Sequence, residues 1–105
     1  MKNEVNKELT EALAETETEV AEPSLYEVVL YNDDYTPMEF VVLVLEKFFY
    51  WERRKAIEIM MEAHLKGKVI CGIFSRDFAE AKVSQVVDYA RLCEHPLTCS
   101  MEANN

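Results

Sequence analysis

The sequence predicts a single small α+β domain, in which three helices pack against a three-stranded antiparallel sheet. Three observations support this fold class. The chain has 105 residues, half of its residues are hydrophobic, and strand-like and helix-like patterns follow one another in the order β-α-α-β-α-β. We expect a folded domain at residues 24–105, preceded by a flexible acidic extension at residues 1–23.

The extension is predicted from its charge and its lack of large side chains. Residues 1–22 contain seven glutamates, two lysines and no aromatic residue, and Pro23 follows. Such a segment cannot bury enough apolar surface to offset the entropy lost on folding. We therefore expect it to be disordered, serving either as a solubilising leader or as an arm that engages a partner.

The first two elements are a strand and an apolar helix. Residues 25–31, LYEVVLY, are β-branched and aromatic, which predicts a strand. Residues 36–51, TPMEFVVLVLEKFFYW, are apolar almost all round, which predicts the central helix. Thr36 suits the N-cap, Pro37 suits the first helical position and Glu39 completes a capping box.

A second helix, a second strand, a third helix and a third strand follow. Residues 54–67 place Ile57, Met60, Met61 and His64 at helical spacing and stop at Gly67. Residues 68–74, KVICGIF, predict a strand. Residues 75–93 open with a serine cap and carry one apolar face, formed by Ala79, Val83, Val86 and Ala90. Residues 96–102 alternate polar and apolar side chains, which predicts the last strand.

The charge of the chain excludes several classes of partner. Eleven basic and 20 acidic residues give a net charge of −9. Nucleic acids and anionic membrane surfaces both attract basic faces, so neither is an expected partner. No apolar run approaches the roughly 20 residues that span a bilayer, and the N-terminus has no signal-like apolar core. We expect a cytoplasmic protein.

The cysteines do not predict a redox or metal site. Cys71, Cys93 and Cys99 are an odd number without a C-x-x-C pair, and reduced, buried thiols are expected. A metal site built from Cys93, His95 and Cys99 is the alternative, but its spacing matches no common zinc pattern. We expect no cofactor and no metal.

Two adjacent aspartates stand out at the junction between the first strand and the central helix. The capping box starts the helix without Asp33 or Asp34, so either they lie in a solvated turn or they serve a site. His64 would complete a set of hydrogen-bond acceptors if it lay opposite the Asn32–Asp34 turn. The residues expected around that set are mostly apolar: Met38, Val41, Met60, Ala63 and Leu97.

At NDDYTPMEFV, EAHLKGKVICGIF, AEAKV and EHPLTCSME the chain closely resembles the ClpS family, adaptors of bacterial N-end-rule proteolysis. The resemblance runs in order from about Leu25 to Glu102. It implies a non-catalytic domain that binds proteins beginning with Leu, Phe, Tyr or Trp. It also implies that the domain delivers them to the ClpA unfoldase of the ClpAP protease and modulates its choice of substrates.

The resemblance also implies roles for individual residues. Asn32, Asp34 and His64 match positions that hydrogen-bond the ligand's α-amino group. Asp33 matches a position at the entrance of the same binding site. Asp77 and Lys82 match the surface that docks on the N-terminal domain of ClpA, although a Glu is usual at position 77. The side-chain pocket matches Leu30, Thr36, Met38, Val41, Met60, Ala63 and Leu97.

Two of these positions carry further implications. Met38 matches the position that excludes β-branched side chains, and Ala63 stands where a larger aliphatic residue is common, which would widen the pocket. The acidic extension resembles the family's delivery arm, and a monomer is expected.

Two rival functions remain. An enzyme could use Asp33, Asp34 and His64 in acid–base chemistry, but the sequence shows no nucleophile with a paired base and no phosphate-binding loop. A binding module like the C-terminal domain of the ribosomal stalk protein would share the fold class. That domain lacks the NDD turn paired with a histidine on a helix.

Overall fold

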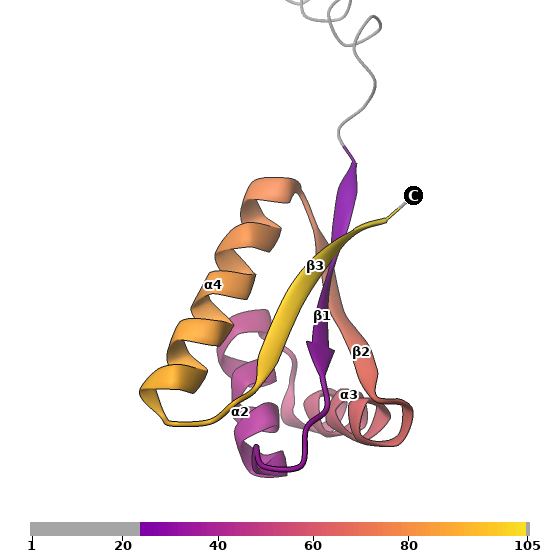
Figure 1. Ribbon diagram of the computed structural model, residues 1–105. Helices are drawn as coiled ribbons and strands as arrows, with labels where there is room; N and C mark the ends of the chain where they lie inside the picture. The colour runs from indigo at the N-terminus through magenta and orange to yellow at the C-terminus, as the bar shows by residue number, and fades with distance from the viewer. Residues whose placement is uncertain (1–23, 105) are drawn as a thin grey trace, which may run out of the picture.

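The structure, a computed structural model, describes residues 24–104 and confirms the α+β fold (Figure 1). The predicted acidic extension at residues 1–23 lies outside the described residues. The elements follow the predicted order: β1 (Leu25–Tyr31), α2 (Met38–Phe49), α3 (Arg53–Lys66), β2 (Lys68–Phe74), α4 (Arg76–Leu92) and β3 (Thr98–Asn104). None of the helices within residues 24–104 has the length and apolar character of a membrane-spanning segment.

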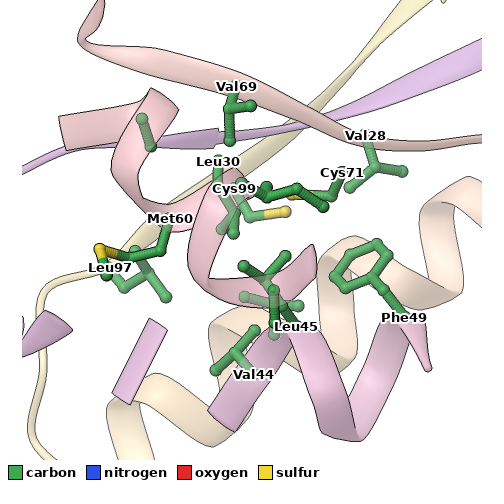
Figure 2. Packing of buried hydrophobic residues seen from close by; sticks show 14 of the residues in the cluster. Val28, Leu30, Val44, Leu45, Phe49, Met60, Val69, Cys71, Leu97 and Cys99 are labelled. Atoms are coloured by element: carbon green, nitrogen blue, oxygen red, sulfur yellow. The ribbon is translucent and has the colours of Figure 1, made fainter. Parts of the chain in front are cut away.

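The sheet has β1 at its centre, with β2 and β3 antiparallel on either side (Figure 1). Its covered face contributes Val28 and Leu30 to the same core as helix residues such as Leu45 (Figure 2). On the other face, Ile70 and Ile73 are about half exposed. The sheet is therefore covered by helices on one face, because only that face carries buried side chains from all three strands.

Two strands have the predicted bounds, and the third begins two residues later than predicted. Pro96 has no backbone N–H to donate, so it cannot join the ladder as an ordinary strand residue. The first pair between β1 and β3 joins Tyr31 to Thr98. Leu97 is left just outside the sheet, where its side chain is buried.

The predicted capping box at the start of α2 is wrong. The helix begins at Met38, and Pro37 occupies the N-cap position in an extended conformation without a side-chain cap. The Thr36 hydroxyl donates to Asp33 instead. The Glu39 carboxylate accepts hydrogen bonds from the Arg53 guanidinium at 2.8 and 2.9 Å. Thr36 is thus committed to Asp33 in the preceding turn, and Glu39 to Arg53 at the start of α3.

The predicted apolar stripe of α3 is confirmed at Met60 and wrong at its other three positions. Ile57 and Met61 are each more than a third exposed, and His64 is exposed. The buried face consists of Ala56, Ile59, Met60 and Ala63. The helix ends as predicted, since Gly67 adopts a left-handed conformation and donates its N–H to the carbonyl of Ala63.

Two aromatic residues, Tyr50 and Trp51, follow the end of α2. Tyr50 adopts a left-handed conformation, with φ 59°, and ends the helix. Trp51 donates its indole N–H to the carbonyl of Cys71 at 2.9 Å. Cys71 is the extra residue of a β-bulge, because Val28 pairs with Gly72 and Val29 with Ile70. The bulge leaves this carbonyl outside the regular ladder, where the indole reaches it.

The expected buried thiols are present in β2 and β3. Cys71 and Cys99 are buried and Cys93 is half-buried, and all three are free. Burial raises the pKa of Cys99 to about 12, and burial together with the charge of Cys99 raises the pKa of Cys71 further. Both buried thiols are therefore protonated at neutral pH and poorly reactive.

A strained residue follows α4. Glu94 has a φ of 63°, in the left-handed region, and its N–H bonds to the carbonyl of Arg91. The N–H of His95 bonds to the carbonyl of Ala90 at 2.8 Å. These two bonds form a Schellman motif, whose left-handed position favours glycine.

Replacing Glu94 with glycine is expected to raise the free energy of unfolding by about 0.5–1 kcal/mol, because the left-handed strain of an L-residue is removed. Urea denaturation measures the change. As a matched control, Gln85→Gly lies inside α4 and should lower the same quantity by about 1 kcal/mol. Equal losses in both variants would contradict the strain argument.

Candidate functional site

A hollow opens where β1 ends and α2 begins. It has about 250 Å³ of empty volume, part of it open to solvent. Segments far apart in sequence form its walls: the end of β1, the turn before α2, the first turn of α2, the last turn of α3 and the residue before β3. The lining residues are Leu30, Tyr31, Asn32, Asp33, Thr36, Val41, Ala63 and Leu97.

The turn at the rim is organised by Asp33. Its Oδ1 accepts hydrogen bonds from the backbone N–H of Tyr35 at 2.8 Å and of Thr36 at 2.7 Å. Its Oδ2 accepts a bond from the Thr36 hydroxyl at 2.8 Å. Asp33 therefore fixes the conformation of the chain between β1 and α2. The sequence had predicted that Thr36 and Glu39 would start the helix without it.

These bonds also set the ionisation of Asp33. Partial burial acts to raise the pKa of its carboxyl, but the hydrogen bonds from Thr36 and Tyr35 outweigh burial, and the charge of His95 adds to them. The pKa therefore lies below its ordinary value of 3.8. The rim carries a full negative charge at neutral pH.

The rim is tied to the end of α3 through Asn32. Its backbone N–H donates to the carbonyl of Gly67 at 2.9 Å. The side chain of Asn32 is exposed, so its amide oxygen is accessible from solvent. The last turn of α3, which carries His64, consequently lies next to the turn that carries the aspartates.

The base of the hollow is apolar. Leu30, Ala63 and Leu97 are each at least 95% buried, and Val41 is half-buried. Figure 2 shows Met60 and Leu97 at the end of the core cluster away from Phe49. A ligand with a small cationic group and an apolar side chain would match this arrangement, with the charge at the rim and the side chain at the base.

Some of the predicted site residues do not line the hollow. Asp34 and His64 are exposed, Met38 is 47% exposed and Met60 is buried in the core. Sequence reasoning missed Tyr31, which lines the hollow and whose hydroxyl lies 2.9 Å from that of Ser100. The strand pattern of residues 25–31 did not reveal it, because a tyrosine at the end of a strand is common.

The two residues predicted to dock on a partner lie on α4. Asp77 is exposed in the first turn of the helix. The Lys82 ammonium donates to the carbonyl of Phe48 at 2.7 Å and lies 4.9 Å from the centre of the Tyr50 ring. Lys82 thus also stabilises the C-terminus of α2. Within residues 24–104, no three His, Cys, Asp or Glu side chains are grouped to hold a metal ion.

The fold and the hollow define a small ligand-binding domain. Residues 21–100 match the family described as ClpS, ATP-dependent Clp protease adaptor protein. The chain belongs to the ClpS family, so it is a non-catalytic adaptor of the ClpAP protease.

Individual relatives support this assignment. The chain is 50% identical over 88 residues to the ATP-dependent Clp protease adapter protein ClpS of Alkalilimnicola ehrlichii, covering 84% of this chain and 83% of the relative. It is 50% identical over 93 residues to the protein of the same name from Vibrio atlanticus, covering 89% and 88%. The solved structure of Agrobacterium tumefaciens ClpS2 bound to L-phenylalaninamide matches with a TM-score of 0.77 and 37% identity, covering 79% of this chain and all of that one.

Proposed function

We propose that the hollow binds the first residue of a protein whose free N-terminus carries Leu, Phe, Tyr or Trp. The adaptor then hands this protein to the ClpA unfoldase of ClpAP. The observation that carries the proposal is the lining of the hollow, with a charged rim beside an apolar base. The relative bound to L-phenylalaninamide supports it, because that ligand combines a free α-amine with a phenyl side chain.

The α-ammonium group is assigned to the rim. It has three N–H donors, and burying it without partners would cost several kcal/mol. Asn32 supplies an amide oxygen, Asp34 a carboxylate and His64 a ring nitrogen. Both Asp33 oxygens already accept bonds from its own turn, so Asp33 contributes negative charge and shape more than new hydrogen bonds.

The side chain of the first residue is assigned to the apolar base. Leu30, Val41 and Leu97 are its main walls, with Thr36 at the rim and Met38 and Met60 at the margin. Ala63 presents only a methyl group, which makes the base wider than a larger aliphatic residue would. Burying a Leu or Phe side chain contributes about 1.5–3 kcal/mol. Association and ordering offset much of this, which points to a micromolar-range affinity, on the order of −8 kcal/mol.

Delivery is assigned to surfaces away from the hollow. Asp77 and Lys82 on α4 would dock on the N-terminal domain of ClpA, and the acidic residues 1–23 would act as an arm during transfer. Asp77 has a shorter reach than the usual Glu, which weakens this contact. We place the adaptor in the cytoplasm as a monomer.

The test is calorimetric titration of the full chain with two peptides of one sequence, a Phe-initiated peptide and its N-acetylated form. Acetylation removes the positive charge and two donors and leaves acceptors at the rim unpaired, so affinity should fall at least about 100-fold. An internal-Phe peptide with a free N-terminal Ser is the control for side-chain burial alone. Equal affinity for the free and acetylated peptides would overturn the proposed function.

A further inference from the structure

His95 packs against the start of α2, beside residues that line the hollow, from a loop that the proposed function does not use. It lies between α4 and β3 and is half-buried. Its ring packs against Phe40 with centroids 4.4 Å apart and planes inclined at 62°. Phe40 is itself buried in the first turn of α2, where its N–H bonds to the carbonyl of Pro37. The contact therefore joins the start of α2 to the chain that enters β3.

That chain leads from His95 to the hollow within two residues. The N–H of His95 is fixed to the end of α4 by its bond to the carbonyl of Ala90. Pro96 locks its own φ and restricts the residue before it to extended conformations. Leu97 comes next, and its buried side chain forms a wall of the hollow. Few free backbone torsions separate the two residues, so a shift of His95 would be passed on to Leu97.

The opposite walls depend on the other side of the same contact. Val41 is the next residue after Phe40 in α2, and it lines the hollow. Asp33, which shapes the rim, is also near His95. Burial acts to raise the pKa of Asp33, and the charge of His95 acts with the hydrogen bonds described above to lower it. The ring of His95 thus lies where it can influence the distance between Leu97 and the residues on α2 and the preceding turn, Val41 and Asp33.

We propose that His95 is a positioning residue of the binding site, which holds the Leu97 wall against the start of α2 through its ring contact with Phe40. The inference rests on the proposed binding of an N-terminal residue in the hollow. If the wall is held in this way, losing the ring lets Leu97 retreat. The smaller Leu side chain of a ligand then loses more contact than a Phe ring does.

The experiment measures the ratio of affinities for Phe-initiated and Leu-initiated peptides, by calorimetry on the full chain. His95→Ala and His95→Gln should both shift this ratio toward Phe by at least threefold, and His95→Phe, which keeps a ring, should hold it within twofold of the wild type. A variant that is merely less stable loses affinity for both peptides by the same factor, so the ratio isolates the shape of the hollow. His95→Gln supplies the measurement if the alanine variant does not fold.

Tyr89 offers a matched control. Its ring also packs on Phe40, with centroids 5.5 Å apart, but it lies on α4 and does not lead into the hollow. Tyr89→Leu should lower the melting temperature and leave the ratio within twofold. An unchanged ratio in both His95→Ala and His95→Gln overturns the inference, as does a His95→Phe variant that behaves like them. If the wild type binds neither peptide, the proposed function has failed instead.

Discussion

Replacing Leu45 with alanine is expected to lower the free energy of unfolding by about 2–5 kcal/mol. Leu45 is fully buried in the centre of α2, within the cluster that joins the helices to the sheet (Figure 2). Removing its terminal carbons takes away their transfer free energy and leaves a cavity that the surrounding side chains fill only in part. Urea denaturation followed by circular dichroism measures the change.

Leu43 is the matched control for Leu45. It lies in the same helix but is 41% exposed, so Leu43→Ala removes the same atoms while creating no internal cavity. The expected loss is below about 1 kcal/mol. If the two variants lost the same stability, the assignment of the buried face of α2 would be wrong.

Replacing Asp33 with asparagine is expected to reduce affinity for a Phe-initiated peptide about tenfold and to lower the free energy of unfolding by about 1 kcal/mol, as when a helix cap is lost. The amide keeps the shape of the side chain but removes its charge and one of the two acceptor oxygens. Because the hydrogen bonds from Thr36 and Tyr35 favour the charged carboxylate, they hold its pKa below 3.8 in the folded protein.

The sign of this shift fixes the pH dependence. A carboxyl whose pKa is lowered on folding stabilises the protein above its unfolded pKa, and this contribution is lost as the pH falls through the lowered value. The difference in free energy of unfolding between wild type and Asp33→Asn should therefore be constant from about pH 7 to 5. It should disappear as the pH falls below about 3.8. Asp34→Asn is the matched control, because Asp34 is exposed, and it should change the stability little. A difference for Asp33→Asn that persists at pH 2 would contradict the role of its ionisation.

The order of elements could be read from the sequence because hydrophobic spacing is a local property. The strands at residues 25–31 and 68–74 were predicted to the residue. On the predicted face of α4, Ala79, Val86 and Ala90 are buried and Val83 is partly buried. The face of α3 was not, because two of its buried residues, Ala56 and Ala63, are small and give a weaker pattern than Ile57 and Met61. Packing selected the side that allows close approach to the sheet.

The start of α2 shows a second limit of local reasoning. Thr36, Pro37 and Glu39 match a capping box. In the structure, however, the Thr36 hydroxyl bonds to Asp33, and the Glu39 carboxylate bonds to Arg53. Roles at the hollow came from the family resemblance, since the residues that line it are brought together only by the fold. The contact between Phe40 and His95 has no signature in either segment alone and becomes visible only in three dimensions.

The tryptophan that bonds to the bulge in β2 is an intrinsic fluorescent probe. Trp51 is the protein's single tryptophan, and its indole is held on the Cys71 carbonyl at the opposite end of α2 from the hollow. Emission from this ring should report separation of α2 from the sheet during denaturation, and it should remain nearly silent when a small ligand occupies the hollow. Fluorescence can thus follow unfolding of the adaptor without a signal from ligand binding itself.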